Sequence, residues 1–231
     1  MGSNPLQKNL LEKNYTQILK RINIAQALQS KKNKTCLIVV SKNQSIESIE
    51  TLFKLGQRDF GENYVQELCK KAEKLNQKGY TGLRWHFIGH LQTKKVKALL
   101  NDVNCIHTLD SEKIVLEVHR RWSELKSNQR LPVFIEVNID NEPTKTGVLP
   151  EQVYSLSQKI KNLNSFDFQG LMCIPKRGSS SRGSFARLLE LGKTLPCPEL
   201  KLSMGMSDDF EIAIQEGATH VRIGSEIFKS S

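Results

Sequence analysis

Short apolar runs and longer amphipathic stretches alternate along nearly the whole chain. The apolar runs have the length of buried strands and lie at 36–42, 58–61, 84–90, 105–109, 131–139, 166–174, 199–204 and 219–224. Between them, apolar residues with helical spacing occupy 45–56, 62–77, 92–101, 111–126, 150–163, 184–195 and 208–216. Eight strands separated by helices predict an α/β fold, a single (β/α)8 TIM-type barrel. An open doubly wound sheet is less consistent, because no G-x-G-x-x-G turn follows the first strand.

An extra helix is predicted before the first strand. Its apolar face is formed by residues that recur every three or four positions, namely Leu11, Tyr15, Ile18, Ile22 and Ala25. The lysines of this segment fall mostly on the other face. We therefore expect residues 1–34 to form a basic amphipathic helix packed on a barrel of residues 35–231, with one domain overall.

The formal net charge of +10 is concentrated at the start, where residues 1–34 hold seven basic residues and one acidic residue. Such a segment raises a nucleic acid or an anionic membrane as a partner. A solvated helix face explains the charge better, and Tyr15 is the only aromatic residue available there for stacking. The apolar runs are also far shorter than a membrane span. We expect neither a specific nucleic-acid partner nor a membrane.

The five cysteines indicate a reducing compartment. They are odd in number, widely spaced and without a C-x-x-C pair, so we predict a cytoplasmic protein with buried thiols and no disulfide. His86 and His90 share one face of a predicted strand, but no third ligand is evident. We therefore predict structural histidines and no metal site.

The run Cys36–Lys42, CLIVVSK, places a lysine directly after a buried strand. Period-two alternation puts Lys42 on the same inward side as Ile38 and Val40. Two interpretations remain open at this point. The amine extends to solvent at the strand end, or it lies in an apolar pocket with a lowered pKa and attacks a carbonyl group.

Two turns near the end of the chain have the composition of an anion site. The turn Ser203–Ser207, SMGMS, follows the seventh strand, and Arg222–Ser225, RIGS, follows the eighth. Glycine permits close approach of a ligand, while backbone N–H groups and serine hydroxyls donate hydrogen bonds to it. TIM barrels frequently bind phosphate after strands seven and eight, so we predict a phosphate site here.

Closing the barrel brings the first and eighth strands together, and with them Lys42 and the phosphate turn. Arg222 lies two residues before Gly224 and projects from the same side of its strand. A phosphorylated aldehyde between Lys42 and the turn would leave Arg222 to meet a ring nitrogen. Pyridoxal 5′-phosphate (PLP) has this combination of groups.

Six motifs then carry a resemblance to the pyridoxal phosphate homeostasis protein family. They are VSK (40–42), FGENYVQE (60–67), WHFIGHLQ (85–92), GLM (170–172), LSMGMSDD (202–209) and VRIGSEIF (221–228). The resemblance implies a barrel similar to the N-terminal domain of alanine racemase, with PLP as a covalent aldimine on Lys42. It also implies the remaining cofactor-binding residues: Asn63 lining the pocket, Arg222 at the pyridine nitrogen, and Ser203 or Ser207 with Gly224 and Ser225 around the phosphate.

The resemblance favours a PLP carrier in vitamin B6 homeostasis over an enzyme. Racemisation needs acid–base groups on both faces of the substrate, and the similar racemase takes the second from a β-rich domain for which this chain has no residues. The alternative is a small PLP-dependent racemase or lyase, and slow side activity is compatible with either. The expected partners are PLP and apo-PLP enzymes, with the chain as a monomer or weak dimer. The Gly/Ser/Arg-rich segment 175–184 is interpreted as a lid or a disordered connector.

Overall fold

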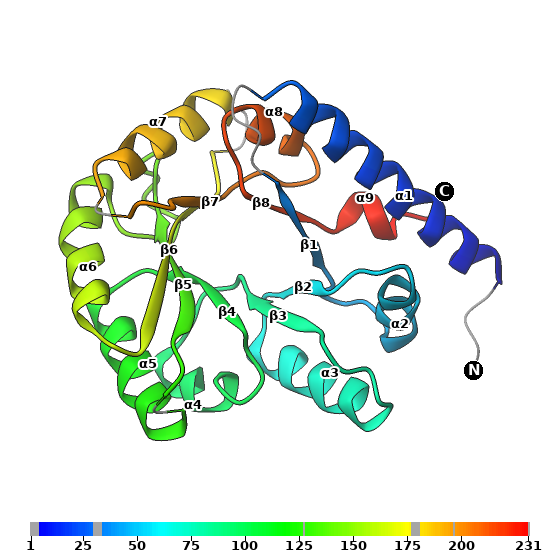
Figure 1. Ribbon diagram of the computed structural model, residues 1–231, viewed down its shortest axis with the longest axis horizontal. Coiled ribbons are helices and arrows are strands. Elements are labelled where there is room, and N and C mark those ends of the chain that lie inside the picture. The colour runs from blue at the N-terminus through cyan, green and yellow to red at the C-terminus, as the bar shows by residue number, and fades with distance from the viewer. Residues whose placement is uncertain (1–4, 30–33, 127, 177–180, 196, 231) are drawn as a thin grey trace.

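The computed structural model describes residues 5–29, 34–126, 128–176, 181–195 and 197–230. Its parallel strands follow one another around a closed barrel, in which β1 pairs with both β2 and β8 (Figure 1). The strands are β1 (Cys36–Val40), β2 (Asp59–Glu62), β3 (Arg84–Phe87), β4 (Cys105–Leu109), β5 (Leu131–Val137), β6 (Phe166–Cys173), β7 (Lys201–Ser203) and β8 (His220–Ile223). Each overlaps one predicted apolar run, so the predicted barrel is confirmed.

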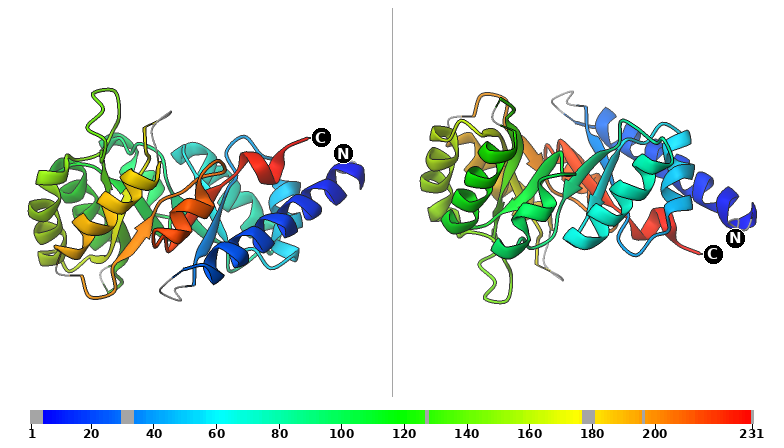
Figure 2. Two further views of the ribbon diagram at one scale, coloured as in Figure 1. Left: turned by 90° about the horizontal axis from the view of Figure 1, so that it is seen from above. Right: turned by 90° about the horizontal axis from the view of Figure 1, so that it is seen from below.

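Helices form a ring outside the strands (Figures 1 and 2). They are α1 (Pro5–Ala27), α2 (Ile46–Lys54), α3 (Val65–Gln77), the 3-10 turn η1 (Thr93–Lys95), α4 (Val96–Leu99), α5 (Glu112–Leu125), α6 (Pro150–Asn162), α7 (Ser181–Lys193), α8 (Phe210–Gln215) and α9 (Ser225–Phe228). Serine side chains cap two of them, since Ser45 and Ser111 accept hydrogen bonds from backbone N–H groups three residues later. No helix in the described ranges is both long and apolar enough to cross a membrane.

Helix boundaries differ from the prediction most at three places. Helix α3 begins at Val65, three residues after the predicted start. The pattern at 92–101 forms a 3-10 turn and one turn of α-helix rather than a continuous helix. Helix α7 begins at Ser181, three residues before the predicted start, because the apolar periodicity there begins only with Phe185. The predicted lid or connector at 175–184 falls partly on 177–180, outside the described residues.

Helix α1 packs along α2, α8 and α9 with the predicted face (Figure 1). Leu11, Tyr15, Ile18, Ile22 and Ala25 are all at most 8% exposed. The Tyr15 hydroxyl donates to the Gln57 side chain at 3.1 Å, and Arg21 pairs with Glu211 and Glu226 on α8 and α9. The helix therefore packs against the last described helix, α9, and both lie on one side of the barrel (Figure 2).

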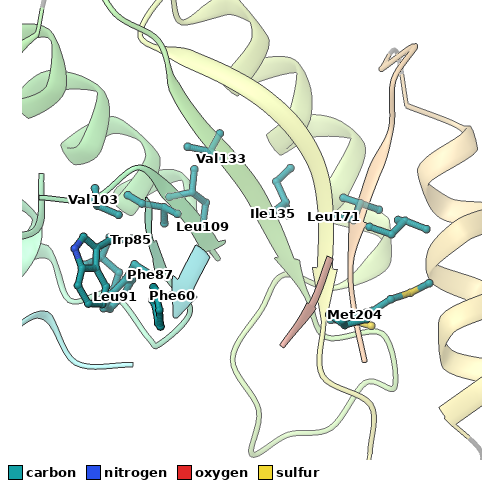
Figure 3. Packing of buried hydrophobic residues seen from close by; sticks show 14 of the residues in the cluster. Phe60, Trp85, Phe87, Leu91, Val103, Leu109, Val133, Ile135, Leu171 and Met204 are labelled. Atoms are coloured by element: carbon teal, nitrogen blue, oxygen red, sulfur yellow. The ribbon is translucent and has the colours of Figure 1, made fainter. Parts of the chain in front are cut away.

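Buried residues form two separate groups, one between the strands and the helices and one inside the barrel. Between strands and helices lies an apolar core that includes Phe60, Trp85, Phe87, Leu109 and Val133 (Figure 3). Inside the barrel, the buried apolar residues Cys105, Phe134 and Met172 form a separate small cluster. Buried polar side chains join them there, and they are His86, His107, Ser203 and Arg222. Branched apolar residues usually fill TIM-barrel interiors, so this polar filling needs a reason beyond packing.

Candidate functional site

Lys42 stands at the carboxyl end of β1, where a TIM barrel places its functional groups. The strand ends at Val40, Ser41 is buried, and the Lys42 side chain is exposed. The interpretation of an amine held in an apolar pocket is therefore wrong for this ligand-free chain. Asn43 follows with a φ of 60°, and its N–H donates to Glu67 Oε2 at 3.2 Å, which fixes the turn that carries the lysine.

A second lysine, Lys71 on α3, lies close to this turn but is buried. Its amine donates to the Ser41 carbonyl and to Glu62 Oε1, both at 2.7 Å, and to Glu67 Oε2 at 3.2 Å. Burial raises the pKa of Glu62, although hydrogen bonds from Lys71 and Ser41 oppose that effect. Three acceptors thus hold the Lys71 amine, whereas the Lys42 side chain is exposed beside it. The sequence analysis did not identify Lys71, for which the only local signal is its four-residue spacing from Glu67.

Arg222 projects into the barrel from β8, the strand that pairs with β1. It is 4% exposed, and its guanidinium donates to Ser203 Oγ at 2.7 Å and to the Cys173 carbonyl at 2.9 Å. Burial lowers its pKa, yet a guanidinium stays protonated in proteins. The side chain is a buried cation with its orientation fixed from two sides.

The two serines left open for the phosphate occupy different places. Ser203 is fully buried inside the barrel, where its hydroxyl contacts His107 and Arg222. The Ser207 hydroxyl instead lies 2.8 Å from that of Ser225, at the start of α9. The structure therefore brings together Ser207, Gly224 and Ser225, and it does not bring Ser203 to them.

The backbone of this turn lies directly against β1. A Cβ atom added to Gly224 would stand 2.8 Å from the Val40 carbonyl oxygen, so only glycine permits the approach. No side chain caps the first turn of α9, which leaves its N–H groups to other acceptors. We call the place where Ser207, Gly224 and Ser225 meet the closing turn. Its predicted position beside Lys42 follows from the pairing of β1 with β8.

Buried acceptors without a hydrogen-bond partner gather at the same end of the barrel. Among the described residues, four buried side-chain oxygens have no hydrogen-bond partner, and three of them are Glu62 Oε2, Asn63 Oδ1 and Glu136 Oε2. These three lie at the carboxyl ends of β2 and β5. Leaving such an atom unpaired costs about 1–3 kcal/mol, so their concentration here fits a polar ligand.

Glu136, a buried carboxylate on β5, was not among the predicted cofactor-binding residues. Its Oε1 accepts a hydrogen bond from the Thr146 hydroxyl at 2.7 Å, and burial raises its pKa.

The backbone of Asn63 lies directly against Gly89. A Cβ atom at position 89 would lie 2.0 Å from the Asn63 carbonyl oxygen. The glycine of the IGH motif therefore sets the place of Asn63.

His86 and His90, which share one face of the predicted strand, have different surroundings in the structure. His90 is at the surface, 3.1 Å from an Asp110 carboxylate oxygen. His86 instead contacts His107 of β4, and their ligand atoms lie with that of Cys105 within 4.8 Å of one another. The two imidazole nitrogens are 2.9 Å apart, the distance of a hydrogen bond, so each is already engaged with the other.

Three surface hollows of about 500 to 740 Å³ are present in the described part of the chain, and the one beside His90 and Asp110 lies at the carboxyl ends of β3 and β4. One lies between α1, α2 and α9, one beside His90 and Asp110, and one on the outer face of α1. None of the three is lined by Lys42 or Arg222, so the candidate site is defined by its side chains and not by a hollow.

Comparisons with known proteins agree with this geometry. The sequence model of the alanine racemase N-terminal domain matches residues 14–231. A pyridoxal phosphate homeostasis protein of Pasteurella multocida is 37% identical over 229 residues, which covers 94% of this chain and 96% of the relative. One from Aquifex aeolicus is 42% identical over 201 residues, covering 83% and 85%.

Solved structures show the same relationship. PipY of Synechococcus elongatus PCC7942, with PLP bound, superimposes with a TM-score of 0.75 at 32% identity, covering 84% of this chain and 92% of PipY. Alanine racemase of Clostridium difficile 630 shares the fold alone, with a TM-score of 0.66 at 15% identity, covering 96% of this chain and 57% of the racemase. The chain belongs to the family of the alanine racemase N-terminal domain and, within it, to the pyridoxal phosphate homeostasis proteins.

Proposed function

We propose that the chain binds pyridoxal 5′-phosphate as a Schiff base on Lys42 and serves intracellular vitamin B6 homeostasis without a dedicated catalytic reaction. The single observation that carries the proposal is the accessible amine of Lys42 beside the pairing of β1 with β8, which places it near Arg222 and the closing turn. The relatives named as homeostasis proteins and the PLP-bound PipY structure support it.

Lys42 is a better nucleophile than Lys71, the other lysine beside the end of β1. A Schiff base forms only from an unprotonated amine that can reach the aldehyde. Lys71 donates to three oxygens, and these contacts restrict its movement. Lys42 is not restricted in this way, because its side chain extends to solvent.

The other cofactor groups are assigned by the chemistry of the residues present. Arg222 would donate to the pyridine nitrogen, because its two hydrogen bonds use two of the five N–H donors of a guanidinium. Ser207, Gly224 and Ser225 would hold the phosphate through hydroxyl and backbone donors. The unpaired amide oxygen of Asn63 would line the pocket. Ser203 would act on the cofactor through Arg222 rather than on the phosphate.

A carrier role agrees with the residues around the proposed ring position. An arginine at the pyridine nitrogen leaves that nitrogen unprotonated, which weakens the electron-withdrawing chemistry that PLP supplies to enzymes. Tyr80 packs edge-on against Phe53, and Tyr154 lies on α6 in the outer ring, so neither offers the opposing base of a racemase. The racemase or lyase alternative would require α-proton exchange of amino acids in deuterated water, at rates above those of free PLP.

The experiment that tests the proposal is reductive trapping. Wild-type protein is saturated with PLP, reduced with borohydride, digested and analysed by peptide mass. We expect the phosphopyridoxyl mass on Lys42, and no such mass or visible absorption band in the Lys42→Ala variant. Lys54→Ala, which removes an exposed lysine from α2, is the matched control and should label as wild type does. Stoichiometric label on Lys71 in the wild type would contradict the assignment.

The remaining expectations belong to the same proposal. The recipients would be apo-PLP enzymes, and the chain would act as a monomer or weak dimer without a nucleic-acid or membrane partner. All five cysteines are free, which supports the expected cytoplasmic location.

A further inference from the structure

A continuous row of hydrogen-bonded side chains crosses the interior of the barrel and ends at Arg222. We call it the interior relay, and its members are Arg222, Ser203, His107, His86 and Asp59. Arg222 contacts Ser203 at 2.7 Å, Ser203 contacts His107 Nδ1 at 2.8 Å, His107 Nε2 contacts His86 Nδ1 at 2.9 Å, and His86 Nε2 contacts Asp59 Oδ1 at 3.0 Å.

The relay joins strands that only the closed barrel brings together. Ser203 and His107 are 96 residues apart and belong to β7 and β4, which lie opposite each other across the barrel (Figure 1). Asp59 is the first residue of β2, at the amino ends of the strands, where it also pairs with Arg84. Four of the five members are buried, and only Asp59 reaches the edge of the barrel.

Arg222 needs such support because it is a buried cation. Among the described residues, no carboxylate lies within ion-pair distance of it, although buried charges are normally paired. Its nearest anchors are the neutral Ser203 hydroxyl and Cys173 carbonyl. The carboxylate at the far end of the relay is Asp59, where burial opposes ionisation but hydrogen bonds from His86 and Arg84 outweigh it and lower the pKa.

With both imidazoles neutral, the two ends of the relay set the direction of every bond within it. A guanidinium only donates and an ionised carboxylate only accepts. Ser203, which accepts from Arg222, then donates to His107 Nδ1. His107 donates through Nε2–H to His86 Nδ1, and His86 donates through Nε2–H to Asp59. All four bonds are made with both imidazoles neutral and in the Nε2–H form. Burial lowers the pKa of His107 well below its usual value, in agreement with a neutral ring.

We infer that the interior relay positions Arg222 for the pyridine nitrogen of the cofactor, so that Ser203, His107, His86 and Asp59 are positioning residues of the site. This inference rests on the proposed function. The guanidinium is held in place before the ligand arrives, and less ordering is then needed on binding.

The first test uses the ligand-free wild-type protein and does not depend on the cofactor. In uniformly 15N-labelled protein, long-range proton–nitrogen spectra at neutral pH identify the tautomer of each histidine. We expect Nε2–H forms for both His86 and His107, with signals assigned by their loss in His86→Gln and His107→Gln. An Nδ1–H form, a doubly protonated ring at either residue, or a stoichiometric metal ion bound by His86, Cys105 and His107 would overturn the relay.

The second test measures the cofactor from a distance. PLP labelled with 15N in the ring is bound to wild type and variants. Reductive trapping on Lys42 in a separate portion of each sample confirms equal loading, and the ring nitrogen resonance is then recorded. We expect Ser203→Ala and Asp59→Asn to shift this resonance, and Ser203→Ala to weaken PLP retention about tenfold, the loss of one charge-assisted hydrogen bond. Arg84→Gln leaves the Asp59 carboxylate in place and should give the wild-type resonance.

The outcomes separate the relay from the proposed function. A wild-type resonance in fully loaded Ser203→Ala and Asp59→Asn would show that the relay is structural only and overturn the inference. Absence of any trapped adduct on Lys42 in the wild type would refute the proposed function, together with the role of the relay toward a cofactor. In that case the tautomers of the ligand-free protein still decide whether the relay itself exists.

Discussion

Acid should destabilise this protein through the imidazoles buried inside the barrel. His220 of β8 lies edge-on to Phe134 with ring centroids 5.3 Å apart, and burial lowers its pKa to about 3. The unfolded chain protonates a histidine at about pH 6.5. Because the folded value is lower, the stabilisation is complete above pH 6.5 and is lost as the pH falls toward 3.

The magnitude follows from the two pKa values. At pH 5 the unfolded His220 is protonated and the folded one is not, which favours the unfolded state by about 2 kcal/mol. A native domain has a total stability of only about 5–15 kcal/mol, so this loss is measurable. Asp59 acts in the same direction, but only near and below pH 4, because its unfolded pKa is about 3.9. The raised pKa values of Glu62 and Glu136 act in the opposite direction.

Urea unfolding of the ligand-free protein at pH 7 and pH 5 isolates the histidine. From pH 7 to pH 5 the free energy of unfolding should fall by about 2 kcal/mol less in His220→Asn than in wild type. The carboxyl groups that both proteins share contribute equally and cancel in this difference. His90→Asn controls for the loss of an imidazole at the surface. An equal fall in wild type and His220→Asn would refute the assignment of a neutral imidazole at His220.

Three further predictions concern side-chain packing and thiol accessibility near the carboxyl ends of the strands. Lys71→Met leaves Glu62 buried without its cation, so we expect a loss of about 3 kcal/mol in thermal unfolding, partly restored by adding Glu62→Gln; no restoration would contradict the pairing. Gly89→Ala places a methyl group against the Asn63 carbonyl and should lower both the melting temperature and PLP retention, measured by dialysis. The thiol of Cys173, with its pKa raised to about 12 by burial, should react with a thiol reagent at pH 8 only after unfolding, and rapid native labelling would contradict its burial.

The barrel could be predicted because its elements are coded locally. Each strand is a short run of apolar residues and each helix repeats its apolar positions, so both signals are contained within about ten residues. Even the short run at 58–61 corresponds to β2, and the apolar face of α1 is buried as expected. The errors lie at boundaries, as at α4 and at the start of α7, where periodicity is weak.

The candidate site was predicted only in part. The sequence placed Lys42, Arg222 and the closing turn at neighbouring strand ends, because the order of strands around a barrel follows the order of the chain. It could not decide between Ser203 and Ser207, which are four residues apart but lie inside the barrel and at the closing turn, respectively. Whether Lys42 is buried was also left open, since exposure depends on where the strand ends.

The sequence by itself determined the class of fold, the order of the strands and the residue types available at their carboxyl ends. Only the tertiary structure decided which polar groups meet across the barrel: the buried Lys71 beside Ser41 and the row of side chains from Asp59 to Arg222. The physical reason is the range of the interactions. Apolar periodicity acts between near neighbours in the chain, whereas a hydrogen bond between residues 96 positions apart exists only after the barrel has closed.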